Sequence, residues 1–251
     1  MTERPTDPDD ASRTDEVLEA LDPDFHDNSL AALAWRRVKG TFVVDEWGFD
    51  PDLVAALTPL ARLRWTFEVD GAEYLPEIGP ALIVTNQRME PVSAMLVAVA
   101  LREATHRPVR FSGVPDLAPI GPALRRMGGV HDGLDDLRSL LHAGELIVRS
   151  FRGSLVDVAG LGDPETGALG VALSLGVPVV PVLMSGAALG RRRRLLVGAP
   201  IVTRRRKRPT TPRGWQDEHV SPSEAIATSA ASADGLAETL RRRMAQLADA
   251  P

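Results

Sequence analysis

The spacing of apolar residues predicts strands that alternate with helices. Residues 65–69 alternate between apolar and polar positions, as in a strand with one buried face, whereas residues 81–85 form the continuous apolar run of a strand buried on both faces. Further strand-like runs lie at 109–112, 145–149, 178–184 and 195–202, and helix-like segments lie at 52–63, 92–102, 120–127, 134–143 and 167–175. This order favours an α/β fold in which helices flank a mostly parallel central sheet.

The two ends of the chain differ from this central part. Residues 1–28 combine many acidic residues with prolines, which predicts a disordered lead-in. Residues 29–205 form the predicted α/β domain, and residues 206–233, rich in Arg, Pro, Ser and Ala, indicate a linker. Residues 234–251 predict a last helix that is capped by Asp234 and has one apolar face, made by Leu236, Leu240, Met244 and Leu247.

The composition narrows the class of protein. The chain has 251 residues and contains no cysteine, which excludes disulfide scaffolds, Cys-based zinc sites and thiol catalysis. Its apolar stretches are shorter than the roughly 18 residues that a membrane-spanning helix needs. The first residues are acidic rather than basic and apolar, so a secretory signal is not expected. The expected location is the cytoplasm, including the cytoplasmic surface of a membrane.

The charge distribution indicates an anionic partner. The net charge is -5, but Arg191–Arg194 and Arg204–Arg208 form two basic runs near the end of the predicted domain. These runs could form a solvated surface or could face lipid headgroups. Because the planar guanidinium suits phosphate groups, we expect an anionic membrane surface as a partner. Nucleic acid is not expected, since the chain as a whole is acidic and the basic runs lack interleaved aromatic residues.

Polar residues follow two of the predicted strands, at the ends where α/β sheets bind their ligands. The residues after 81–85 are Asn86, Gln87, Arg88, Met89 and Glu90, and those after 145–149 are Ser150, Phe151, Arg152, Gly153 and Ser154. The first group could hold a substrate or could cap the next helix. The second group could hold an anion or form an ordinary glycine turn. The residues alone leave these alternatives open.

A third polar group, His131–Asp136, places a histidine beside carboxylates. Such a cluster could form an acid–base pair or bind a metal ion. A helix start explains it as well, with Asp132 or Gly133 as the N-cap and with Asp135 and Asp136 in the favourable first turn. We interpret it as a helix start.

Four segments carry a recognisable pattern, in this order along the chain: Gly71–Asn86, Ile120–Val130, Leu140–Gly153 and Gly167–Gly186. They resemble the sequence blocks of the glycerophospholipid acyltransferases of phospholipid biosynthesis, the 1-acylglycerol-3-phosphate acyltransferase type and its relatives. The upstream segment Asp45–Asp50 also resembles the lead-in of a bacterial branch of these enzymes. The resemblance implies an α/β fold that needs no cofactor and transfers an acyl group from acyl-CoA or acyl carrier protein to the hydroxyl of a lysophospholipid or glycerolipid.

The chain departs from both catalytic motifs that the resemblance implies. Family members carry Asn-His and, after four further residues, Asp, and the histidine removes the proton from the acceptor hydroxyl. Here Gln87 follows Asn86 and cannot act as a general base, and the nearest acid is Glu90, three residues further on. The family motif Phe-Pro-Glu-Gly corresponds to Ser150-Phe151-Arg152-Gly153, so a positive charge replaces a negative one.

These departures lead to two functional hypotheses. In the first, Gln87 and Glu90 occupy the catalytic positions of a weak acyltransferase. In the second, the chain is a pseudoenzyme that binds a lysophospholipid or phospholipid, or that regulates a related active acyltransferase. In both, the substrate-binding residues are those at matching motif positions: Asn86, Arg88, Phe151, Arg152, Gly153 and Ser154. The loss of a general base favours the second hypothesis.

The pair His131 and Asp136 has the family spacing, but it lies between the second and third blocks. We therefore do not expect it to replace the missing catalytic pair. Instead, we expect Gln87 and Arg152 to line one cleft at the ends of two adjacent strands.

Overall fold

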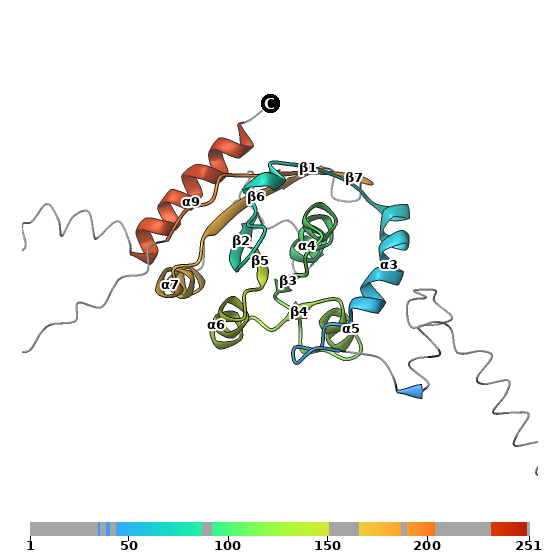
Figure 1. Ribbon diagram of the computed structural model, residues 1–251. Helices are drawn as coiled ribbons and strands as arrows, with labels where there is room; N and C mark the ends of the chain where they lie inside the picture. Colours follow the sequence, from blue (N-terminus) through green and yellow to red (C-terminus); the bar gives the residue numbers. More distant parts are fainter. Residues whose placement is uncertain are drawn as a thin grey trace, which may run out of the picture.

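A single seven-stranded sheet with helices on both faces forms the centre of the molecule (Figure 1). The computed structural model describes residues 35, 39–40, 44–86, 92–150, 166–186, 190–203 and 232–249. The strands are β1 (Thr66–Asp70), β2 (Ala81–Thr85), β3 (Val109–Ser112), β4 (Gly129–Val130), β5 (Leu146–Ser150), β6 (Val179–Ser185) and β7 (Arg192–Val197). Five of them lie within one residue of the predicted runs, and β7 overlaps the predicted run 195–202 only at Leu195–Val197. The strand β4 was not predicted, because two residues give no periodicity.

The strand order is β1-β7-β6-β2-β5-β3-β4, and neighbouring strands are parallel except for the antiparallel pair β6 and β7. The predicted α/β fold with a mostly parallel sheet is thus confirmed. β2 and β5 lie near the middle of the sheet and are buried at every residue, which explains their continuous apolar runs. β7 runs opposite to β6, so its first residues lie at the edge where β2, β5 and β6 end.

The helices follow the predicted segments within a few residues. They are α3 (Pro51–Arg64), α4 (Val92–Thr105), α5 (Ile120–Arg126), α6 (Leu134–His142), α7 (Thr166–Leu175) and α9 (Ala233–Ala248), and a short 3-10 helix, η1, spans Ala72–Tyr74. Within the described ranges, no helix is both long enough and apolar enough to cross a bilayer.

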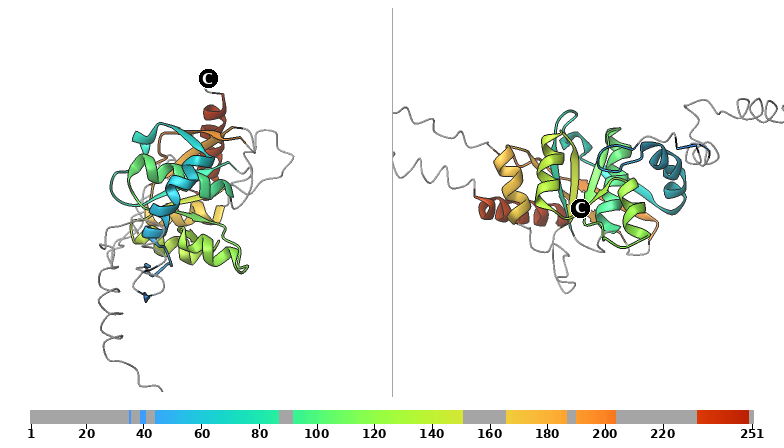
Figure 2. Two further views of the ribbon diagram at one scale, coloured as in Figure 1. Left: turned by 90° about the vertical axis from the view of Figure 1, so that its right-hand side faces the viewer. Right: turned by 90° about the horizontal axis from the view of Figure 1, so that it is seen from below.

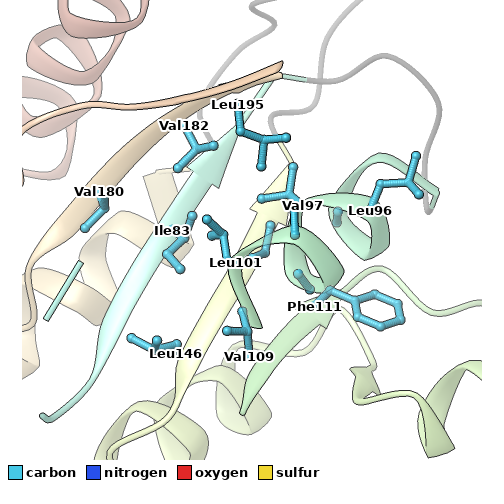
Figure 3. Close-up of a cluster of buried hydrophobic side chains, with 14 of the residues drawn as sticks. Ile83, Leu96, Val97, Leu101, Val109, Phe111, Leu146, Val180, Val182 and Leu195 are labelled. Carbon is cyan, nitrogen blue, oxygen red and sulfur yellow. The ribbon is translucent and has the colours of Figure 1, made fainter. Parts of the chain in front are cut away.

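Two apolar cores lie on opposite faces of the sheet. One packs α4 against the strands, through side chains such as Ile83, Val97, Leu101 and Leu195 (Figure 3). The other packs α6, α7 and α9 against the opposite face (Figures 1 and 2). The sheet is therefore covered on both sides, and its strand ends are left to form a site.

The last helix, α9, lies beside α7 and packs on β6 (Figure 2). As predicted, Leu236, Leu240 and Met244 are buried and Leu247 is partly buried against the same core. The predicted cap was wrong. The helix begins after Ser232, whose hydroxyl accepts a hydrogen bond from the Gly235 N–H at 3.1 Å, and Asp234 lies in the first turn.

The segment before α3 is fixed by buried arginines. The Asp45 carboxylate accepts hydrogen bonds from the backbone N–H groups of Trp47 and Phe49, both at 2.9 Å, and pairs with Arg110 of β3. Burial alone would raise the pKa of Asp45, but these hydrogen bonds and the Arg110 charge outweigh it and lower the pKa. Burial, together with the charge of Arg110, lowers the pKa of Arg102 to about 10.

Candidate functional site

The ends of β2 and β5 meet at one edge of the sheet, which we call the carboxyl edge. The two strands are parallel neighbours, with Thr85 beside Ser150. The expectation that the segments after residue 85 and after residue 150 follow adjacent strands is thus confirmed. The predicted site residues Gln87, Arg88, Glu90, Phe151, Arg152, Gly153 and Ser154 lie outside the described residues. The closeness of Gln87 and Arg152 stays a prediction.

Asn86 is the predicted site residue that the structure does describe, and it joins two strands. Its side chain is 1% exposed. The amide Nδ2 donates to the Met184 carbonyl oxygen at 3.1 Å, and Oδ1 accepts from the Met184 N–H at 2.9 Å. The amide thus extends the contact between β2 and β6 by one residue, and both of its polar atoms are bonded to backbone.

Ser150, the last residue of β5, was not singled out as a ligand-binding residue. It is 8% exposed, and its hydroxyl has no hydrogen-bond partner in the part of the chain that the structure describes. Leu146 and Val148 of the same strand face α4, so strand alternation places Ser150 on that face too. By the same rule Thr85 faces α4, and its hydroxyl donates to Asn86 Oδ1 at 3.3 Å. Two hydroxyl groups thus lie side by side at the carboxyl edge.

A buried guanidinium reaches the same face from β7. Arg193 is 5% exposed and alternates with Leu195, which belongs to the core under α4. A Cβ on Gly186 would lie 2.6 Å from the Arg192 carbonyl oxygen and 3.4 Å from Arg193 Cδ, so this glycine lets the start of β7 pass close to the chain beyond the end of β6. The pattern of residues does not reveal this burial, because four successive arginines look alike until the strand register is known.

The basic run 191–194 therefore does not form one cationic surface. Arg193 is turned into the protein, and Arg194 pairs with Asp70 at 2.8 Å. Arg191 and Arg192 are exposed at the carboxyl edge. The second basic run, 204–208, lies outside the described residues.

The segment His131–Asp136 starts a helix, as interpreted. Gly133 is the N-cap of α6, and Asp135 and Asp136 lie in its first turn. The carboxylate of Asp132 pairs with Arg149 of β5 at 2.8 Å. The Nε2 atom of His131 lies 2.8 Å from Arg125 Nη1 and accepts its hydrogen bond, because a guanidinium can only donate.

The segment His131–Asp136 lies closer in space to the candidate site than its place in the sequence suggests. It follows β4, which runs parallel to β3 and β5, so it also lies at the carboxyl edge. β4 is the last strand in the order, however, and β3 and β5 separate it from β2. Among the described residues, no group of three or more His, Asp or Glu side chains could hold a metal ion.

A cavity of about 280 Å³ lies elsewhere, between α3 and the second half of α4. Its lining is mainly apolar and includes Val54, Leu57, Val99 and Met127. Its lining includes neither Asn86 nor Ser150, so it is distinct from the candidate site at the carboxyl edge.

Comparisons of the sequence with known proteins find relatives that match about half of the chain. No protein-family model matches the chain. Proteins of Mycobacterium tuberculosis and Mycobacterium bovis, both described as uncharacterised, are 35% identical to it over 129 residues, which cover 47% of this chain and 36% of theirs. A Mycobacterium leprae protein, described in the same way, is 33% identical over 132 residues. The matched part thus spans little more than a third of these relatives.

One solved structure shares the fold over most of its length. It is the 1-acyl-sn-glycerophosphate acyltransferase PlsC from Thermotoga maritima, which aligns with a TM-score of 0.51 over 87% of this chain and 89% of that chain. The sequence identity is 15%, so the likeness concerns the fold alone. The chain has the α/β fold of this glycerolipid acyltransferase.

Proposed function

We propose that this protein binds a glycerolipid phosphate, such as a lysophospholipid, at the carboxyl edge of its sheet. We further propose that it transfers acyl groups from acyl-CoA or acyl carrier protein to that lipid slowly or not at all. The observation that carries the proposal is that three polar groups lie on the α4 face of the sheet at this edge. Thr85 and Ser150 are on the adjacent strands β2 and β5, and the buried Arg193 is on β7, which β6 separates from β2.

The charge of Arg193 supports an anionic ligand. Arg193 adds a buried positive charge to this face of the sheet, and guanidinium groups suit phosphate oxygens. The PlsC enzyme that shares the fold is named for an acceptor, 1-acyl-sn-glycerophosphate, that carries one phosphate group. A phosphate ester is therefore the ligand class that best fits the position of Arg193.

The residue types at the motif positions support weak or absent catalysis. Gln87 has no titratable nitrogen, so it cannot remove the proton from an acceptor hydroxyl, and Arg152 reverses the charge of the family glutamate. Losing a general base slows such reactions by about 10²–10⁴-fold. Binding and positioning of the lipid need no base and remain possible.

The binding test compares two neighbouring arginines. The full chain is titrated with a short-chain, water-soluble lysophosphatidate, and Arg193→Gln is compared with Arg194→Gln, which changes the same charge on the opposite face of β7. We expect Arg193→Gln to weaken binding by about tenfold or more, and Arg194→Gln to bind like the wild type. A folded Arg193→Gln variant with wild-type affinity would contradict the proposal.

The catalytic test measures acyl transfer from labelled acyl-CoA to lysophosphatidate beside Thermotoga maritima PlsC. We expect the wild-type rate to be at least about a hundredfold lower. Gln87→His should not restore it, because Glu90 is badly spaced to orient a new imidazole. A rate near that of PlsC, abolished by His131→Ala but not by Gln87→Ala, would instead identify His131 as the general base.

A further inference from the structure

Exposed leucines lie on the last turns of α3, next to the carboxyl edge. Leu63 is 69% exposed and Leu60 is 48% exposed. They are three residues apart and so lie on the same side of the helix. α3 leads directly into β1, whose first residue pairs with Arg192 of β7, so these leucines lie beside the start of β7 (Figure 1).

Two arginines join this end of α3 to the segment just before β7. Arg191 Nη2 donates to the Leu63 carbonyl oxygen at 2.6 Å, and Arg64 Nη1 donates to the Gly190 carbonyl oxygen at 3.5 Å. The Arg64 guanidinium also lies 5.3 Å from the centre of the Trp65 ring. Leu60, Leu63, Arg64, Arg191 and Arg192 thus form one surface in which apolar and cationic groups are adjacent, here called the α3–β7 surface.

The α3–β7 surface lies at the same edge as the candidate site. β7 is antiparallel to β6, and Arg194 pairs with Ser185 at the end of β6, so Arg191 and Arg192 lie beyond that end. Arg193 is buried on the α4 face of β7, and Arg192, the residue before it, is exposed. A partner on the α3–β7 surface would therefore be next to the ligand of the site.

We propose that the α3–β7 surface docks the protein on an anionic lipid bilayer and so presents the carboxyl edge to the membrane. This inference rests on the proposed function, because it takes the ligand of the site to be a lipid. Leucines beside arginines, with a half-buried tryptophan behind them, are the combination that interfacial membrane binding uses. The leucines enter the headgroup region, and the arginines pair with lipid phosphates.

The opposite edge of the sheet offers a matched comparison. Ile78, in the loop that leads into β2, is 90% exposed and so is more accessible than Leu63. Its exposed neighbour is Glu77, which anionic lipids would repel. If exposed apolar area alone drove membrane binding, Ile78 would contribute more than Leu63. The proposed docking instead requires Leu63 together with the arginines.

The experiment is flotation of the full chain with vesicles, either of phosphatidylcholine alone or with roughly a third phosphatidylglycerol. We expect binding to the anionic vesicles only, weakening as salt is added. Arg191→Gln/Arg192→Gln should reduce it by about fivefold per arginine, and Leu63→Ser by about fivefold or more. The matched controls Ile78→Ser and Arg138→Gln/Arg241→Gln, which change exposed residues elsewhere, should leave it unchanged.

Several results would overturn the docking proposal. These are no association with anionic vesicles, equal losses in the control variants, or flotation that Leu63→Ser and the arginine variant leave intact. A change from dimer to monomer in these variants, with unchanged flotation, would assign the α3–β7 surface to a second copy of the chain. Melting temperatures equal to that of the wild type confirm that the variants are folded.

Titration with the short-chain lysophosphatidate separates this inference from the proposed function. The docking variants should bind this water-soluble ligand like the wild type, because the substituted residues are not among those proposed to bind it. If the wild type binds the ligand but does not float, docking is wrong and the proposed function stands. If it floats but does not bind the ligand, the proposed function is wrong and the α3–β7 surface still binds membranes.

Discussion

β2 and β5 end side by side, but their last polar residues have different roles. Asn86, just after β2, bonds with both amide atoms to the Met184 backbone of β6. Ser150, at the end of β5, is buried to nearly the same extent, and its hydroxyl has no partner in the described part of the chain. The Asn86 amide is hydrogen-bonded within the fold, whereas the Ser150 hydroxyl has no such bond among the described residues.

This difference distinguishes a residue that stabilises the sheet from a residue that could bind a ligand. Buried polar groups in proteins are nearly always hydrogen-bonded, and exceptions often occur at functional positions. We infer that Asn86 stabilises the sheet, and that the Ser150 hydroxyl is the group that can hydrogen-bond to a ligand. The opposite face of β5 agrees with this division, since there the buried Arg149 is paired with Asp132 inside the protein.

The largest expected effect is that of Asn86→Ala on stability. The substitution leaves the N–H and the carbonyl oxygen of Met184 without these partners in a buried place, so we expect a loss of about 2–4 kcal/mol in the free energy of unfolding. Chemical denaturation measures it. Lysophosphatidate affinity of the folded fraction should change by less than about threefold, because the amide is engaged with backbone.

Thr85→Val serves as the control for Asn86→Ala. It removes a hydroxyl from the neighbouring residue, whose hydrogen bond to Asn86 is long at 3.3 Å, and should cost less than about 1 kcal/mol. If Asn86→Ala were as mild as Thr85→Val, Asn86 would not stabilise the sheet.

A smaller loss is expected from Asp132→Asn. It removes the carboxylate that pairs with the buried Arg149, but Asp132 is 34% exposed, so water compensates in part. We expect a loss of about 1–3 kcal/mol by denaturation. The control is Asp135→Asn, which breaks an exposed pair with Arg138 and should change stability by less than about 0.5 kcal/mol. Equal effects of the two variants would refute the assignment of Arg149 as internally paired.

The fold could be predicted from the sequence because its elements are local. Continuous apolar runs and helical spacing located six strands and the order of the helices. The cap of α9 was misassigned to Asp234 because Ser232, Ala233 and Asp234 lie together, and both Ser and Asp are good caps. The start of β7 was missed because three successive arginines show no apolar alternation.

The site could be predicted only in part, because its contacts are distant in the sequence. Asn86 was recognised from its place after a strand, but its partner Met184 is 98 residues away. The burial of Arg193 depends on the register between β6 and β7. Ser150 carries no distinctive signal, since a serine at a strand end is ordinary until its hydrogen-bond partners are known.

The smallest effect on stability is expected from Ser150→Ala. The hydroxyl has no hydrogen bond to lose among the residues that the structure describes, so the free energy of unfolding should change by less than about 0.5 kcal/mol. Lysophosphatidate affinity should nevertheless fall by about three- to tenfold, the value of one hydrogen bond to the ligand. Denaturation and ligand titration of the same variant measure the two effects. A loss of stability above about 1 kcal/mol would mean that Ser150 is bonded within the fold like Asn86, and unchanged affinity would mean that the ligand does not contact it.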